Sequence, residues 1–329
     1  MTGRKSVLGS VLACSLALCF GLAPAASGAQ GYPSRPIRMV VPFTPGTGID
    51  IIARTIGPPV TQRWSQPVVV DNKPGASGNI GADVVAKAQP DGYTLMVTVN
   101  TFTMTPALYK RLPYDPVRDF ATVGRVAKGN IALVVNPAVL PVKTLEEFTA
   151  FVRARPGKLT YGSPGNGTPQ HLAVELLKQR LKLDVLHVPY KGAAGALTEL
   201  LGGQVHLMVL PVHTALPFAR SGKLGVIAVS GESRSVLAPD APSFAEVGLK
   251  NLDIDLYFWI AGPAGTSRDI IRKWNEEVAS ILALSDVRES LLKQGMVPSP
   301  SSPAEIAAQI KADIGRWKAF IAETKITAD

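Results

Sequence analysis

The stretch PFTPGTGID, residues 42–50, decides the fold, because it lies where an apolar, strand-like run gives way to a helical pattern. Two other stretches share its composition and its position: NKPGASGNIG at 72–81 and YGSPGNGT at 161–168. Glycine lets a backbone approach a ligand closely, and a following helix directs its first free N–H groups to the same place. Each loop is therefore a candidate anion-binding site.

Apolar runs alternate with helical periodicity on both sides of these loops. The first series reads IRMVVPF, DIIARTIGPPVTQRW, PVVVDN, IGADVVAKAQ and YTLMVTVN, and a second begins at ALVVN and continues through KLTYGS, TPQHLAVELLKQRL and DVLHVPY. Such alternation predicts βαβ units, a mostly parallel sheet and two similar α/β halves. The segment 113–130, PYDPVRDFATVGRVAKGN, is rich in turn residues, and we interpret it as the first crossover between the halves.

The C-terminal part predicts a strand, DLYFWIAGP, and three helices at 268–284, 286–295 and 303–324. In the last helix, large apolar residues recur at helical spacing: Ile306, Ile310, Ile314, Trp317 and Ile321. This spacing is typical of a core face. We expect the last helix to return to the first half and brace it.

The N-terminus has the layout of a cleaved secretory signal. Arg4 and Lys5 precede an apolar stretch at 7–20, and small residues ending in Ser-Gly-Ala follow. An uncleaved membrane anchor is the alternative, but Pro24 and the Ser-x-Ala site disfavour it. We therefore expect a signal peptide at 1–29 and a mature protein in the periplasm.

Composition narrows the classes of function. Lys and Arg number 34 against 25 Asp and Glu, but they are scattered along predicted helical faces with few aromatic residues between them, which argues against nucleic-acid binding. The two cysteines, Cys14 and Cys19, lie inside the predicted signal. The histidines show no tight ligand spacing, so we expect neither a metal nor another cofactor. They are His171, His187, His206 and His213.

Two motifs suggest an enzyme, and both are incomplete. GTGIDI lacks the third glycine of a dinucleotide-binding fingerprint. GSPG lacks the residue that a nucleophile elbow needs between its first glycine and its serine, and Pro164 has no N–H to offer an oxyanion hole. We therefore predict no catalytic residue.

Several stretches together resemble one family, the Bug, or tripartite tricarboxylate transporter (TctC-like), extracytoplasmic solute receptors. They are VPFTPGTGID, DNKPGASGNIGADVVAKAQPDGYTLMV, PALYKRLPYDPVRDF, LTYGSPGNGTPQHLAVELL and VPYKG. The resemblance implies the fold of type II periplasmic binding proteins, α/β with two domains and a ligand cleft between the lobes. It also implies a discontinuous first domain, 31–129 plus 251–329, around a second at 130–250.

The resemblance further implies a ligand and partners. The ligand would be a small organic acid, held mostly by backbone N–H groups and ordered water. A monomeric receptor would deliver it to integral membrane subunits similar to TctA and TctB. A receptor that feeds a signalling system is the alternative, and a secreted hydrolase is the other class considered.

In the first loop, the predicted ligand-binding residues are Phe43, Thr44, Gly46, Thr47 and Asp50. Asp50 could cap the following helix or contact an amino or hydroxyl group of the ligand. The family usually has a double glycine where this chain has Gly46 and Thr47. If that position needs a positive φ, Thr47 is strained; otherwise its hydroxyl narrows and polarises the pocket.

The remaining predicted contacts come from the other loops and from strand ends. The first half supplies Ala76, Ser77, Asn100 and Thr101, and the second supplies Ser163, Asn166, Gly167, Thr168, His171, Tyr190 and Gly192. His171 orients a loop in the alternative interpretation. Asn100 replaces a residue that is usually a small hydroxyl in the family, so it is a candidate for selectivity, as are Val212 and His213.

Overall fold

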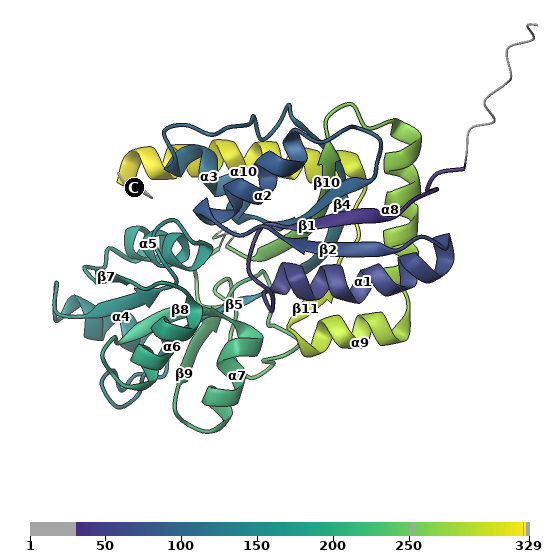
Figure 1. Cartoon of the computed structure of the whole chain (residues 1–329). Coiled ribbons are helices and arrows are strands. Elements are labelled where there is room, and N and C mark those ends of the chain that lie inside the picture. Colours follow the sequence, from purple (N-terminus) through teal and green to yellow (C-terminus); the bar gives the residue numbers. More distant parts are fainter. Residues whose placement is uncertain (1–30, 251, 253, 325, 327–329) are drawn as a thin grey trace, which may run out of the picture.

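The chain folds into two α/β lobes (Figure 1). The computed structural model describes residues 31–250, 252, 254–324 and 326, so the predicted signal peptide lies outside the described residues. Each lobe contains one sheet with helices packed on its faces. The two-lobed α/β architecture expected from the alternating pattern is confirmed.

The sheet of the first lobe has the strand order β11-β4-β10-β3-β1-β2. Its strands are β1 (Ile37–Val41), β2 (Val68–Asn72), β3 (Thr94–Val99), β4 (Phe120–Gly129), β10 (Leu256–Pro263) and β11 (Met296–Pro298). β1 runs parallel to β2 and to β3. β10 runs antiparallel to both of its neighbours, β3 and β4, and β11 runs antiparallel to β4.

The sheet of the second lobe has the order β7-β6-β8-β5-β9. Its strands are β5 (Ile131–Val135), β6 (Thr160–Ser163), β7 (Leu186–Pro189), β8 (Leu207–Pro211) and β9 (Gly225–Val229). β6 is parallel to β7 and β8, whereas β5 is antiparallel to β8 and β9. The expectation of mostly parallel sheets holds for β1–β3 and β6–β8, but the sheets as wholes are mixed. β5 and β10, the strands that receive the chain after each passage between the lobes, run antiparallel to their neighbours.

Ten α-helices and one short 3-10 helix accompany these strands in the described part of the chain. They are α1 (Gly48–Trp64), η1 (Ala76–Gly78), α2 (Asn79–Ala86), α3 (Thr101–Leu108), α4 (Leu145–Arg153), α5 (Pro169–Leu181), α6 (Ala193–Leu201), α7 (Val212–Arg220), α8 (Arg268–Leu282), α9 (Ser285–Lys293) and α10 (Pro303–Thr324). Side-chain oxygens of Thr144, Thr168 and Ser267 cap α4, α5 and α8. Within those residues, no helix is long and apolar enough to cross a membrane.

The passage between the lobes is shorter than the sequence indicates. β4 ends at Gly129 and β5 begins at Ile131, so Asn130 alone separates the two sheets. More than half of the segment predicted as a crossover, 113–130, is instead β4, a ten-residue strand of the first sheet. Its turn residues did not prevent strand formation, because β10 and β11 pair with β4 on either side.

The last helix, α10, packs on the first lobe as predicted, and the five residues of its expected core face are buried. Its C-terminal half also reaches the second lobe. Trp317, Phe320 and Ile321 form one apolar cluster with Leu108 of α3 and with Leu172 of α5. The helix therefore braces the first lobe and also joins it to the second.

Leu172→Ala should lower the free energy of unfolding by about 2–5 kcal/mol, because Leu172 is fully buried in that cluster and its truncation leaves a cavity. Leu186→Ala is the matched control: Leu186 is 52% exposed, and its truncation should cost less than about 0.5 kcal/mol. Urea unfolding followed by tryptophan fluorescence measures both. Equal losses would contradict a packed contact between the lobes at α5.

Candidate ligand-binding site

The first two loops and the start of α3 lie at one edge of the first sheet. Val41 is paired with Asn72, so β1 and β2 end side by side, and β3 runs parallel to them. Val99, the last residue of β3, is opposite Phe258 near the start of β10, because these two strands are antiparallel. The edge that carries the loops is therefore also the edge where β10 brings the chain back from the second lobe.

The second sheet repeats this arrangement. Ser163 at the end of β6 is paired with Pro189 at the end of β7, and β8 is parallel to β6. Ile131, the first residue of β5, is opposite Pro211 at the end of β8. Since Asn130 is the sole residue between β4 and β5, the loop edge of one sheet adjoins the loop edge of the other.

In the first loop, Gly46 rather than Thr47 has the left-handed conformation. The φ angle of Gly46 is +82°, whereas Thr47 has φ −74° and is the N-cap residue of α1. The hydroxyl of Thr47 donates a hydrogen bond of 2.9 Å to the carbonyl oxygen of Thr44. The backbone of Thr47 is therefore not strained, and its hydroxyl stabilises the turn that begins at Thr44.

Asp50 holds the first loop in place. It is 3% exposed and is the third residue of α1, so its interpretation as N-cap is wrong. Its carboxylate accepts hydrogen bonds from the backbone N–H of Gly46 at 2.9 Å, from Nε of Arg54 at 3.0 Å and from Nδ2 of Asn72 at 3.0 Å. Burial raises the pKa of this carboxyl group, but these hydrogen bonds, that from Arg54 foremost, outweigh it and leave the pKa lowered.

The second loop stores backbone strain. Gly75, Ala76, Ser77 and Gly78 all have positive φ, at +129°, +47°, +54° and +91°. For Ala76 and Ser77 this conformation costs about 1–2 kcal/mol each, because the Cβ atom approaches the next carbonyl oxygen. The hydroxyl of Ser77 is held by the hydroxyl of Tyr109 at 2.9 Å. Strain of this kind is concentrated at functional sites in proteins.

Glycine allows the first two loops to touch. A Cβ atom on Gly78 would lie 3.0 Å from Cε2 of Phe43, and one on Gly81 would lie 2.8 Å from Cα of Pro42. The side-chain amide of Asn72 also donates to the carbonyl oxygen of Phe43 at 3.0 Å. The two loops therefore form one surface.

Asn100 and Thr101 follow β3 directly and are 2% and 4% exposed. Asn100 is the N-cap residue of α3, and Thr101 is its first residue. The side-chain amide of Asn100 donates to the backbone carbonyl oxygen of Asp255 at 3.0 Å. Asn100 is thus tied to the segment that returns from the second lobe.

In the third loop, the hydroxyl groups of Ser163 and Thr168 bind the loop itself. Oγ of Ser163 accepts from the N–H of Gly165 at 3.1 Å and lies 2.6 Å from Nε2 of His187. The hydroxyl of Thr168 donates to the carbonyl oxygen of Gly165 at 2.8 Å and caps α5 by accepting from the N–H of His171. Both side chains shape the loop from inside.

His171 and His187 form a neutral pair beneath this loop. Their rings stack with centroids 4.0 Å apart and planes within 9°. Burial lowers the pKa of His171 to about 3 and that of His187 to about 4, so neither is charged near neutral pH. Nδ1 of His171 accepts from the N–H of Gly167 at 3.0 Å. His171 therefore orients the loop, as one of its two interpretations predicted.

Gly167 is needed at the contact between the lobes. Its φ angle is +72°, and a Cβ atom there would lie 2.7 Å from Cδ1 of Leu108 in α3. Its neighbour Asn166 is exposed. The sequence predicted close approach of a ligand at Gly167, whereas the close neighbour in the structure is the first lobe.

Tyr190 and Gly192 are joined to the third loop by their backbones. The N–H of Tyr190 donates to the carbonyl oxygen of Ser163, and that of Gly192 donates to the carbonyl oxygen of Pro164, both at 3.0 Å. Gly192 has φ +117° and is the N-cap residue of α6. The predicted residues of the second lobe are therefore brought together, although the N–H of Gly192 already has a protein partner.

A second contact between the lobes involves His213. A Cβ atom on Gly295, just before β11, would lie 2.6 Å from Nδ1 of His213 in α7. Val212, the first residue of α7, is 2% exposed and donates its N–H to the carbonyl oxygen of Asn130. These two candidates for selectivity pack between the lobes.

Sequence reasoning missed five residues that organise the site: Arg54, Tyr109, His187, Asn130 and Asp255. Arg54 could have been found, since an Arg four residues after Asp50 on a helix has ion-pair spacing. The others act through partners that are remote in sequence. Hydrogen bonds across such separations leave no local pattern.

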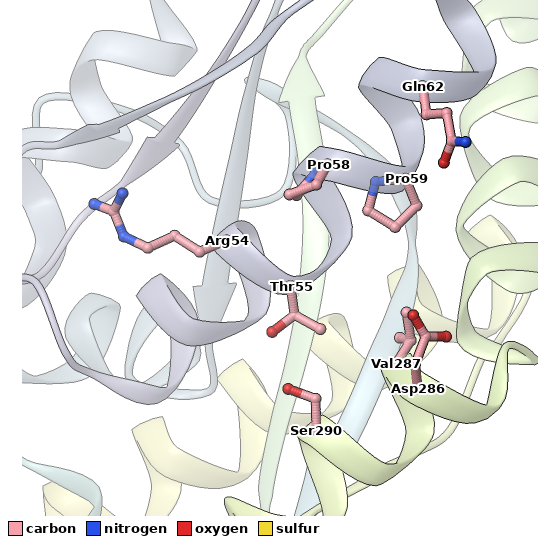
Figure 2. A pocket seen from close by; sticks show the side chains of 8 residues that line it. All are labelled: Arg54, Thr55, Pro58, Pro59, Gln62, Asp286, Val287 and Ser290. Atoms are coloured by element: carbon pink, nitrogen blue, oxygen red, sulfur yellow. The ribbon is translucent and has the colours of Figure 1, made fainter.

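A cavity of about 440 Å³ lies between α1 and α9, and none of the predicted ligand-binding residues lines it (Figure 2). Its lining consists of Arg54, Thr55, Pro58, Pro59, Gln62, Asp286, Val287 and Ser290. In Figure 2 the guanidinium group of Arg54 points away from the other lining side chains, and it binds Asp50 and Asn72 instead. We place the candidate site at the loops, where strain and close backbone contacts coincide, rather than in this cavity.

Comparison with known proteins first defines the class. A solved periplasmic transporter structure matches with a TM-score of 0.81 and 36% identity, over 91% of this chain and all of that one. The fold is thus that of two-domain periplasmic binding proteins. A sequence model described as tripartite tricarboxylate transporter family receptor matches residues 52–326. The chain belongs to this family, whose members are solute-binding proteins.

Individual relatives cover nearly the whole chain. Protein BugT of Bordetella pertussis is 33% identical, over 98% of this chain and 98% of its own. Rpa4515 of R. palustris, solved with adipate, is 32% identical with a TM-score of 0.80, over 90% of this chain and 99% of that one. MatC of Rhodopseudomonas palustris, solved with bound malate, is 31% identical with a TM-score of 0.76, over 88% and 99%.

The histidine pair should make the fold sensitive to acid. In the unfolded chain both imidazoles titrate near pH 6.5, whereas in the fold their pKa values are about 3 and about 4. The unfolded state therefore takes up protons that the folded state does not. The contribution of the two histidines to the free energy of unfolding is fully present above about pH 6.5. Below that pH it falls, by up to about 1.4 kcal/mol per pH unit for each histidine.

Urea unfolding between about pH 7 and about pH 4.5 measures this slope. His171→Gln keeps an acceptor for Gly167 but does not titrate, so the variant should lose about one histidine's share of the slope. The difference between wild type and variant isolates His171 from the other acid-sensitive groups. Parallel slopes would show that the buried imidazole does not control acid stability.

Proposed function

We propose that this protein is a periplasmic receptor that captures a small organic acid between its two lobes and delivers it to a tripartite tricarboxylate-type membrane transporter. It would be exported by a cleaved signal at 1–29 and act as a monomer, with TctA- and TctB-like subunits as partners. One observation carries the proposal: a single residue, Asn130, separates the sheets, so the glycine-rich loops of both lobes border the same space. In that space the loops act as opposite walls of one site.

We propose domain limits on the same basis. The first domain comprises 31–129 plus 251–329, and the second comprises 130–250. The change of sheet after Gly129 and the return of the chain at Leu256 support these limits.

The chemistry of the loops favours a carboxylate. About five charge-assisted hydrogen bonds at about 1.5 kcal/mol each would supply about 7–8 kcal/mol, close to the ~8 kcal/mol of micromolar binding. Because association itself costs several kcal/mol, the ligand must be enclosed by both lobes rather than bound to one. The relatives solved with adipate and malate support a dicarboxylate or hydroxy acid.

The pair of Ser163 and His187 does not favour a hydrolase, although their side chains lie 2.6 Å apart as in a nucleophile and its base. Ser163 is fully buried, and its hydroxyl also binds the N–H of Gly165.

Delivery to a sensor rather than to a transporter is the alternative within the receptor class. Uptake by cells that lack the receptor gene would separate the two, because loss of uptake requires a transport role.

Binding should raise the melting temperature of the mature protein. The panel comprises mono- and dicarboxylates, aromatic acids and acidic amino acids, with the diamides of the same dicarboxylates as controls that lack the charge. A specific acid at 100 times its Kd should stabilise by about 2.7 kcal/mol, and its diamide should not. A flat response, with no co-purified acid in native mass spectrometry, would contradict the receptor; turnover of an acid would favour an enzyme.

A further inference from the structure

Three polar residues lie in a row where the chain passes between the lobes. In the first sheet β10 lies between β3 and β4, and Leu256 of β10 is opposite Gly129 of β4. Asp255, which precedes β10, therefore lies between Asn100, which follows β3, and Asn130, which follows β4. This row sits at the loop edge of the sheet.

Hydrogen bonds join the row to the second lobe. Nδ2 of Asn130 donates to Oδ1 of Asp255 at 3.2 Å and to the carbonyl oxygen of Ser230 at 2.9 Å. The hydroxyl of Ser230, which follows β9, also donates to Oδ1 of Asp255 and accepts from the N–H of Ile131 at 2.9 Å. One carboxylate oxygen thus links both connections between the lobes.

Asp255 also fixes the side chain of Asn100. The backbone carbonyl oxygen of Asp255 accepts a hydrogen bond from Nδ2 of Asn100 at 3.0 Å, and among the described residues no group donates to Oδ1 of Asn100. Rotating the amide by half a turn would place two acceptors against each other, so the bond to Asp255 sets its orientation. Asn100 borders the start of α3, beside the predicted ligand loops.

We propose that Asp255 is a positioning residue that couples the rotation of the lobes to the binding site through Asn100. The coupling to binding rests on the proposed function. The carboxylate of Asp255 holds the two connections together, so that both must rotate as one unit when the lobes move. Its backbone carbonyl oxygen holds the side chain of Asn100 beside the same connections. Without the carboxylate, Asn130 and Ser230 remain hydrogen-bonded to each other but lose their common link to Asp255 at the start of β10. The lobes then sample a wider range of angles, and the site forms less often.

The range of lobe angles can be measured without any ligand. Gln89 and Lys158 are exposed on the first and second lobe, and a chain that starts at residue 31 has no native cysteine, so Gln89→Cys with Lys158→Cys accepts two spin labels. Electron–electron double resonance then gives the distribution of distances between the lobes. Melting temperature is recorded for every variant, to separate mobility from unfolding.

Asp255→Ala and Ser230→Ala should both broaden the distance distribution. Asp255→Asn should restore most of the wild-type width, because an amide oxygen can accept both hydrogen bonds that Oδ1 now accepts. Ser235→Ala is the matched control: Ser235 is a buried serine of the same connection, and its hydroxyl accepts from the N–H of Leu237. Wild-type widths in the folded alanine variants of Asp255 and Ser230 would overturn the proposal.

Affinity tests the link to Asn100. With an acid found in the melting screen, Asn100→Ala and Asp255→Ala should each weaken binding about tenfold, which is ~1.4 kcal/mol. The double variant should also lose about tenfold rather than a hundredfold, because both changes break the same coupling. Multiplied losses would overturn the action through Asn100. If the wild type binds no acid, the proposed function fails, while the label distances still decide whether Asp255 controls the lobes.

Discussion

The structure depends on one constraint, the single residue that joins β4 of the first sheet to β5 of the second. Because Asn130 alone lies between β4 and β5, the edges where these strands meet must adjoin. Antiparallel pairing of β5 with β8 places the carboxyl ends of the parallel strands at that edge in the second lobe, and antiparallel β10 does so in the first. The two strand directions within each sheet are thus the reason that loops distant in sequence lie at adjoining edges of the two sheets.

The left-handed conformations of the second loop and the buried carboxylate of the first cost free energy, which packing elsewhere in the fold must offset. Ala76 and Ser77 are held in left-handed conformations, and Asp50 is ionised in a buried position. Such features persist where the surroundings over-determine them. Tyr109 holds Ser77, and Asn72 and Arg54 hold Asp50. The apolar contact of α10 with both lobes supplies part of the stability that permits this.

Local patterns predicted what is decided locally. The glycine-rich loops, the alternation of strands and helices, and the buried face of α10 follow from spacing and turn chemistry. Partners that are remote in sequence decided the rest. Residues 120–129 looked like a turn-rich crossover but became β4 because strands more than a hundred residues later pair with it. The sequence suggested that Asp50 caps α1, but Thr47 is the N-cap residue, and the carboxylate of Asp50 instead accepts a hydrogen bond from the N–H of Gly46.

The charges around the loops favour dipoles over cations as the groups that hold an anion. None of the residues predicted to contact the ligand is Lys or Arg, and burial keeps His171 uncharged near neutral pH. The carboxylate of Asp50 would repel an anion, but the adjacent guanidinium of Arg54 compensates it. In the proposed receptor, backbone N–H groups and ordered water would then provide the attraction, without a permanent ion pair. In the proposed receptor, an acid held this way would be released when the lobes separate, because no buried cation would be left without its partner.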